Sequence, residues 1–380
     1  MMCLSGDSLE DERVVEMRKR IPFFLALGAP ALFLLLAFGC SEKSTWPAAS
    51  LVLESIPTTL PPRIDGSTLD REWSSAPELL IAMSDGAANG GGSFYIRMKS
   101  VYTPYPDTVY FMLQWADTTD DVLPDRLIYS GPQWLNMDCN SGLTLQDPGN
   151  WTKIASEEGK EDRFCILFEI TPVSDDYGTF ASRGCQVACH NGMKVPSRGT
   201  PNGRFDVWYW MRSRTDPVRR CDDMVLDSTG FRGDAGVAPW RPNLRGAGLV
   251  PRFIARGDNG NLSPAKFVYD PGDYGRGFGP CDTLNPASLL NWNDPRDPAL
   301  DYVPGFVVKE PTGSRGDVIA KADWDEGRWA VEIKRALDTD DVFDDVAFNR
   351  DKTYNFAIAI MNGSRVLHSG SVPLVFRFRR

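Results

Sequence analysis

Two cysteines and a histidine form the most distinctive chemical group in this sequence of 380 residues. Cys185 and Cys189 are separated by three residues, and His190, one of only two histidines in the chain, follows the second cysteine directly. In c-type attachment, two thiols add to the vinyl groups of a porphyrin and the next histidine becomes an axial ligand of the iron. The group therefore predicts haem ligation by His190.

The spacing between the cysteines leaves the mode of attachment open. A c-type site usually has two residues between its cysteines, whereas this chain has Gln186, Val187 and Ala188. One alternative is a purely structural disulfide. Another is a zinc site completed by Cys221, although the spacing fits no common zinc finger.

The first 39 residues are typical of a secretory signal with a lipoprotein cleavage site. A basic segment, Arg18–Arg20, precedes the apolar run Ile21–Phe38, and Gly39 precedes Cys40. We interpret residues 1–16, which are rich in acids, as an upstream mis-start. The sequence thus predicts lipidation of Cys40 and a periplasmic or cell-surface protein anchored to the membrane. A single transmembrane anchor is the alternative, because the run is near the lower length limit for a membrane span.

Charge and cysteine content narrow the class of protein further. The net charge is −10, and outside the predicted signal the chain has no cluster of lysine or arginine, which argues against nucleic acid as a partner. Six cysteines remain when Cys3 and the predicted lipidation site Cys40 are set aside, and in an oxidising compartment an even number favours pairing. They are Cys139, Cys165, Cys185, Cys189, Cys221 and Cys281.

The elements that must position these groups are mostly β-strands. Residues 40–62, rich in Pro, Ser and Thr, predict a tether, and residues 63–380 predict one domain. We expect an all-β fold, a sandwich of the immunoglobulin-like or carbohydrate-binding-module-like kind, with a long loop-rich insertion over about 194–311 that wraps a ligand. Apolar or alternating runs predict strands at Thr108–Trp115, Arg163–Ile170, Arg328–Lys334 and Lys352–Ile360.

One aromatic strand is predicted to be buried on both faces. In the run Phe205–Met211, Trp208 and Trp210 share one face, and Tyr209 lies on the other. We expect one face to meet the sheet and the other to contact the porphyrin, with core packing alone as the alternative.

A compact turn, Asp65–Trp73, predicts a tryptophan packed on the sheet. The turn also resembles the opening of family 9 carbohydrate-binding modules and of the haem-binding sandwiches related to them.

Several segments, taken in order, resemble the ethylbenzene-dehydrogenase-related haem-binding domain, also called the cytochrome c and DMSO-reductase-like haem-binding domain. The resemblance spans roughly Asp65 to His368. It rests on Gln114–Thr119, Glu161–Phe164, Gly184–His190, Asp206–Trp210 with Asp222 and Asp223, Trp324–Trp329, Lys334–Leu337, Phe348, Tyr354 and His368–Ser369.

The resemblance implies a β-sandwich with one haem in an apolar pocket, of the b- or c-type, that serves as an electron-transfer subunit or carrier. In the gamma subunits of molybdenum dehydrogenases the haem is b-type and is held by a methionine and a lysine. No lysine stands out here, and the candidate methionines are Met112, Met137, Met193 and Met211. Each has core packing as its alternative role.

Tyr209 marks a departure from the family pattern. Many relatives carry a histidine between the two tryptophans, so ligation in this chain must differ if that histidine binds iron. His368 then becomes the leading second ligand, because it is the only other histidine. A hydrogen-bonded imidazole is its alternative role.

The sequence therefore predicts an exported electron carrier that catalyses no reaction by itself. Its expected partner is a redox protein, such as a molybdenum oxidoreductase or another cytochrome. Hydrolase and phosphate-loop motifs are absent from the sequence. A carbohydrate-binding sandwich without haem is the main alternative, and a ligand-free adhesion sandwich is the third.

Overall fold

The computed structural model describes twelve stretches of the chain, and the statements below concern these residues. They are residues 51–84, 94–129, 137–138, 142–143, 151–153, 159–189, 192–196, 202–245, 250–251, 268–269, 302–364 and 367–380. The predicted signal, Cys40, Cys139, His190 and Cys281 lie outside them, as does the side chain of Cys189.

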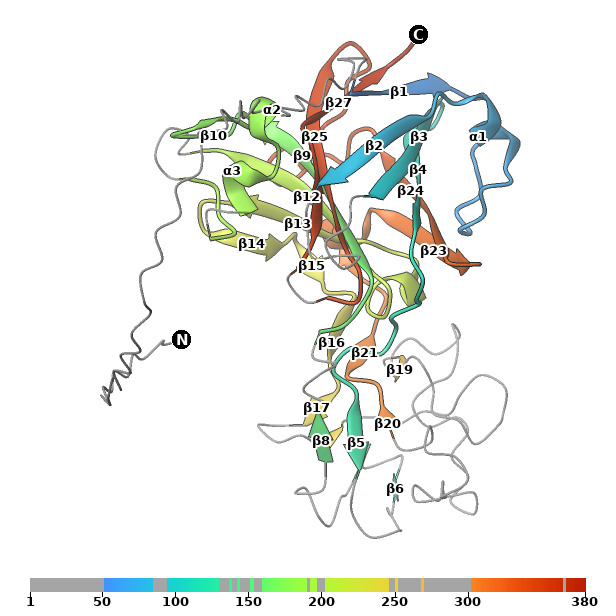
Figure 1. Cartoon of the computed structure of the whole chain (residues 1–380), viewed down its shortest axis with the longest axis vertical. Helices are drawn as coiled ribbons and strands as arrows, with labels where there is room; N and C mark the ends of the chain where they lie inside the picture. The colour runs from blue at the N-terminus through green and yellow to red at the C-terminus, as the bar shows by residue number, and fades with distance from the viewer. Residues whose placement is uncertain are drawn as a thin grey trace, which may run out of the picture. The chain divides into compact units, whose positions relative to one another are not determined.

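The fold is an all-β sandwich, as predicted, in which one continuous 13-stranded sheet supplies both layers (Figure 1). The first layer follows the order β14 (Gly230–Gly233), β13 (Asp222–Asp227), β12 (Arg204–Met211), β9 (Arg163–Thr171) and β25 (Thr353–Met361). The second follows the order β2 (Leu79–Ser84), β3 (Phe94–Pro104), β4 (Asp107–Ala116), β24 (Arg328–Ala336) and β23 (Ile319–Asp325).

Three further strands connect the layers. β26 (Ser369–Ser371) pairs with both β25 and β2, whereas β27 (Leu374–Phe378) and β1 (Val52–Pro57) bridge β25 to β3. The pairings of β1 with β27 and with β3 are both parallel. The prediction of a tether up to residue 62 is therefore wrong for Val52–Pro57, because Leu53 and Ile56 of this strand are buried in the sandwich.

The four strands predicted from apolar patterns are confirmed as β4, β9, β24 and β25. The predicted insertion over 194–311 is only partly loop. It contains β12, β13 and β14, which belong to the main sheet, together with several short strands. The segment after Cys221 forms β13 by pairing with residues 205–209 of the apolar strand β12.

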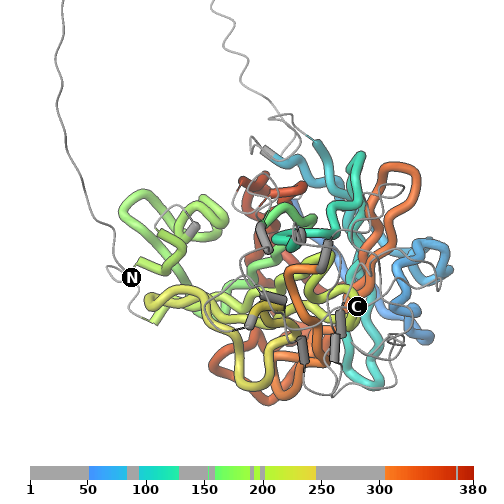
Figure 2. Tube along the Cα trace, turned by 90° about the horizontal axis from the view of Figure 1, so that it is seen from below, coloured from blue at the N-terminus to red at the C-terminus, as the bar shows by residue number. Residues whose placement is uncertain are grey.

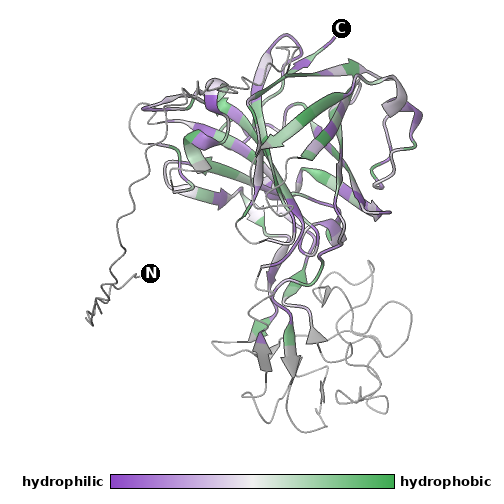
Figure 3. Ribbon diagram, viewed as in Figure 1, coloured by the Kyte–Doolittle hydropathy of each residue, from purple (hydrophilic) through white to green (hydrophobic). Residues whose placement is uncertain are grey.

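The space between the layers is filled by aromatic and branched side chains, and Figure 3 shows apolar residues along these strands. Trp210 stacks on Phe164 with 5.5 Å between ring centroids, and it contacts Trp115 and Trp329 at 6.4 and 5.3 Å. Each aromatic pair of this kind contributes about 1 kcal/mol beyond the area that it buries. The packing of these side chains therefore fixes the position of one layer against the other.

A second apolar cluster covers the outer face of the first layer. Two short helices, α2 (Phe180–Arg183) and α3 (Gln186–Cys189), contribute Phe180, Val187 and Ala188 to it. Figures 1 and 2 show this segment on the side of the first layer away from β4 and β23. Because both faces of the layer are covered, β9 and β12 are apolar on both sides.

Small elements complete the described structure. The helices are α1 (Arg71–Ser75), η4 (Asp216–Val218) and η8 (Ser314–Gly316). Minor sheets pair β10 (Ser174–Asp175) with β11 (Gly178–Thr179), β15 (Gly236–Val237) with β22 (Thr312–Gly313), β17 (Leu244–Arg245) with β18 (Val250–Pro251), and β6 (Met137–Asp138) with β7 (Gly142–Leu143). One three-stranded sheet has the order β16 (Trp240–Pro242), β21 (Phe306–Val308), β19 (Val268–Tyr269). A second has the order β20 (Tyr302–Val303), β5 (Leu127–Tyr129), β8 (Trp151–Lys153). Within the described part, no helix is long and apolar enough to span a membrane.

Candidate cofactor-binding site

The described half of the cysteine motif is docked on the outer face of the first layer. Helix α2 ends at Gly184, whose φ of +60° turns the chain sharply before Cys185. The Cys185 side chain is buried, and its Sγ lies 3.5 Å from the position that a Cβ on Gly370 would take. Cys185 therefore packs directly over Gly370 of β26.

A row of four residues lies across the sheet beneath the motif. The strand register places Tyr209 beside Cys165, Cys165 beside Ala359, and Ala359 beside Gly370. Ala359 and Gly370 are small, and Cys165 is buried in the same apolar cluster as Cys185. Small residues on this face leave space for the covering segment, which explains why α2 and α3 can lie so close to the strands.

One end of this face carries a polar group and a thioether. The Tyr209 hydroxyl accepts a hydrogen bond from Arg163 Nη1 at 3.2 Å and lies 3.7 Å from Met361 Sδ. Burial raises the pKa of Tyr209, so its hydroxyl keeps its proton. The neutral Tyr209 hydroxyl is thus held in one orientation by its contacts with Arg163 and Met361.

A buried ion-pair network fixes Arg163. Its Nε lies 3.0 Å from Glu161 Oε2, and Arg214 Nη2 lies 2.7 Å from the same oxygen. Burial alone would raise the pKa of Glu161, but Arg214 and Arg163 outweigh it and lower that pKa. Ser213 adds a backbone donor to Glu161 at 2.7 Å. Glu161 therefore stays ionised, and the guanidinium of Arg163 has a permanent partner.

His368 stands directly before β26 and is half-buried. It is two residues from Gly370, the residue against which Cys185 packs. The chain segments that carry Cys185 and His368 are consequently neighbours in the fold, as the prediction of a His190 and His368 ligand pair requires. The position of His190 itself lies outside the described residues.

The three aromatic residues predicted to contact a cofactor divide between two faces. Tyr209 lies with Cys185 on the outer face, whereas Trp208 and Trp210 are fully buried in the core between the layers. Trp208 packs on Phe168 at 5.0 Å and on Phe111 at 5.6 Å. The core-packing alternative therefore describes both tryptophans, and Tyr209 alone of the three adjoins the cysteine motif.

Sequence reasoning missed two methionines on this side of the sheet. Met361 lies beside Tyr209 at the end of β25, and Met224 of β13 packs against the outer cluster. Of the four methionines that were considered, Met112 packs beside Trp73 in a separate cluster, Met211 is buried, and Met193 is 44% exposed. The side chain of Met137 is outside the described part. The signal for Met361 was available: it continues the outward series Ala357, Ala359 at the end of β25.

Cys221, the added ligand of the alternative zinc site, lies apart from Cys185 in the described structure. Cys221 is buried in the core between the layers, whereas Cys185 belongs to the outer cluster. Cys165 and Cys221 are both buried thiols outside any disulfide, so the expected pairing does not include them. Burial raises the pKa of both thiols, so both keep their protons at neutral pH.

The turn from Asp65 to Trp73 has a structural role. Trp73 is 1% exposed, and its Nε1 donates to Glu332 Oε1 at 2.8 Å. The backbone N–H groups of Asp65 and Gly66 both donate to the other oxygen of that carboxylate, at 2.9 Å. The tryptophan side chains that the structure describes are all buried or half-buried, so none of them is one of the exposed tryptophans expected of a sugar-binding module.

The donor types on the outer face fit a haem. The thiol of Cys185, the thioether of Met361 and the imidazole of His368 belong to segments around one apolar cluster. Nitrogen and sulfur donors next to apolar side chains are the groups that ligate and enclose haem iron in proteins.

Comparison with known proteins gives one result that covers most of the chain. A family model described as ethylbenzene dehydrogenase matches residues 70–372. The match includes the cysteine motif, the strands beneath it and His368. A search of curated proteins finds no match.

Proposed function

Because this chain belongs to the ethylbenzene dehydrogenase family, we propose that it is a haem-binding protein that acts as an electron-transfer subunit or carrier. The observation that carries the proposal is the docking of Cys185 on a sheet face that also presents Tyr209 and Met361 and ends next to His368. A bound haem would supply one-electron exchange between its ferric and ferrous states.

The residues of this chain have distinct roles in the proposal. His190 would provide the first ligand to the haem iron, and His368 or Met361 would provide the second. The apolar cluster beneath α2 and α3 excludes water from the site, which keeps the charge reorganisation small when an electron moves. Tyr209, which Arg163 holds in place, orients a hydroxyl at the edge of the face. Cys185 and Cys189 provide covalent attachment if the haem is c-type.

We also propose where the protein works and with which partner. The signal and Cys40 support export and anchoring of the protein to a membrane through lipid. The acidic chain suits a redox partner protein, either a molybdenum oxidoreductase or another cytochrome. In such a complex this chain relays electrons, and the partner performs the chemical reaction.

Single substitutions test the assignment of ligands. The full chain is exported in a bacterial host as wild type, His190→Ala, His368→Ala and Met361→Leu, with Gln186→Ala as control. Gln186 is an exposed residue of α3, so its replacement leaves the docked face intact. Haem content per chain and the position of the Soret band are then measured for each variant.

We expect His190→Ala to lose most of its haem and Gln186→Ala to keep it. A shifted band in only one of His368→Ala and Met361→Leu identifies the second ligand. If His190→Ala keeps both the haem content and the spectrum of the wild type, His190 is not a ligand. Extraction with acid and acetone then separates the two linkages, because only non-covalent haem leaves the protein.

A further inference from the structure

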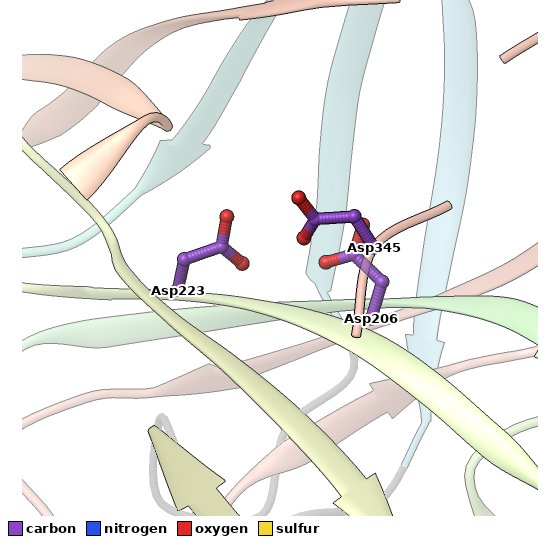
Figure 4. Close-up of side chains that lie close together, drawn as sticks. All are labelled: Asp206, Asp223 and Asp345. Atoms are coloured by element: carbon purple, nitrogen blue, oxygen red, sulfur yellow. The ribbon is translucent and has the colours of Figure 1, made fainter. Parts of the chain in front are cut away.

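Three aspartates meet in the interior on the opposite side of β12 from Tyr209. They are Asp206 of β12, Asp223 of β13 and Asp345, which lies between β24 and β25. One carboxylate oxygen of each lies within 4.8 Å of the others, and Figure 4 shows the three carboxylates turned toward one another. Asp206 and Asp223 are 0% exposed, and Asp345 is 2% exposed.

The sheet register creates this meeting point. Asp223 pairs with Trp208, and Asp206 pairs with Val225, so the two aspartates are diagonal neighbours on one face. Asp345 reaches them because the N–H of the next residue, Val346, donates to Asp206 Oδ2 at 3.0 Å. These residues are far apart in the sequence, and three separate segments supply them.

The three carboxylates are buried, but several of their oxygens have no hydrogen-bond donor. Arg335 pairs with Asp206 and lies 3.7 Å from Asp345 Oδ1, but neither oxygen of Asp223 has a hydrogen-bond partner. Asp206 Oδ1 and Asp345 Oδ1 also lack hydrogen bonds. Buried carboxylates are normally paired, hydrogen-bonded or bound to a metal. Asp223 is a completely buried side chain that points into the cluster without a donor.

A further buried aspartate nearby increases the excess of negative charge around the cluster. Asp234 is also buried, and both of its carboxylate oxygens lack partners. Burial, followed by the charge of Asp206, raises the pKa of Asp345 to about 7, and burial raises that of Asp223 well above its usual value. Without a cation, these groups must hold protons near neutral pH.

We propose that Asp206, Asp223 and Asp345 bind a hard divalent cation, and specifically Ca²⁺. All the donor atoms are carboxylate oxygens, which hard cations prefer. Ca²⁺ binds oxygen at about 2.3–2.6 Å, so two of its ligands can lie up to about 5 Å apart, in agreement with the observed grouping. Mg²⁺ keeps several waters and is less suited to a buried, all-protein site.

The charges support a divalent ion rather than a monovalent one. Three carboxylates and the guanidinium of Arg335 sum to two negative charges, and Asp234 and Asp317 add further negative charge nearby. A divalent ion therefore offsets more of this charge than a monovalent one does. The ion would tie β12 and β13 to the segment before β25, and so stabilise the strand that carries Tyr209 from its other face. This role is independent of haem.

The test uses the full chain after exhaustive removal of metal with a chelator. Calcium is added back, with magnesium in a parallel sample, and binding is followed by calorimetry and by the thermal unfolding midpoint. We expect one Ca²⁺ per chain and a rise in Tm of about 5 °C when Ca²⁺ exceeds its Kd by about 100-fold. The absence of any calcium effect on wild type would overturn the proposal, and an equal response to Mg²⁺ would overturn the choice of Ca²⁺.

Two substitutions distinguish a metal ligand from a residue needed only for folding. Asp223→Asn keeps the shape but removes the charge, so we expect Ca²⁺ affinity to fall at least about 10-fold while the metal-free protein keeps or gains stability. Asp325→Asn, at an exposed position of β23, is the control and should bind Ca²⁺ as wild type does. Wild-type calcium affinity in Asp223→Asn, or equal destabilisation with and without calcium, would contradict the assignment.

Discussion

Tyr209 differs from both of its tryptophan neighbours in what its side chain touches. Trp208 and Trp210 fill the core, whereas Tyr209 contacts Arg163 and Met361 on the face that carries Cys185. Alternation along a strand separates adjacent residues into different environments. A replacement at 209 should therefore act on the cofactor site, and a replacement at 210 should act on the stability of the whole fold.

We predict that Trp210→Ala lowers the free energy of unfolding by about 3–5 kcal/mol, because it leaves a cavity against Phe164 and Trp329. Tyr209→Phe removes one hydroxyl and should cost about 1 kcal/mol. Chemical denaturation monitored by tryptophan fluorescence and by circular dichroism measures both. Similar losses for the two variants would show that Tyr209 is as much a core residue as Trp210.

At the scale of elements, a pair of carboxylates separate from the three-aspartate cluster links the ends of three strands. Asp117 follows β4, Asp162 precedes β9, and the loop after β25 contributes Gly363. Asp162 accepts backbone N–H groups from Asp121 at 2.8 Å and from Gly363 at 2.9 Å. Burial, and then the charge of Asp117, raises the pKa of Asp162 to about 8. Burial likewise raises the pKa of Asp117 to about 6.

These shifts predict a stability that falls as pH rises. The folded state binds protons more tightly than the unfolded chain between about pH 4 and pH 8, so the free energy of unfolding decreases across that window. Asp117→Asn removes one titrating group and the charge that raises the pKa of Asp162, so we expect a shallower decrease. Urea denaturation at pH 5 and pH 8 tests this, with Asp325→Asn as control. An unchanged slope for Asp117→Asn would refute the coupling.

The strands that sequence analysis found have longer apolar or alternating runs than the strands that it missed. β4, β9, β24 and β25 were predicted because their buried residues form long apolar or alternating runs. β1 was missed because it is short and its buried apolar residues, Leu53 and Ile56, are three apart, which breaks the alternation expected of a strand. β13 was missed because it begins with two aspartates, which a strand rarely buries without a special reason.

Sequence analysis could predict only those residues of the candidate site that local motifs identify. Cys185 and Tyr209 were identified from their own segments, but Met361 gains its meaning from a register that brings three strands together. The cluster of Asp206, Asp223 and Asp345 depends entirely on contacts between segments distant in the chain. No spacing in the sequence encodes such a group.

On the scale of the whole molecule, we propose electron transfer through a bound haem because the chain belongs to the ethylbenzene dehydrogenase family and Cys185 is docked on one face of its sandwich. The most direct test is the visible spectrum of the exported full chain before and after reduction with dithionite. The account predicts a Soret band in the oxidised protein, with sharper bands and a shifted Soret maximum after reduction. A protein that is folded by circular dichroism but shows no haem absorption in either state would contradict it.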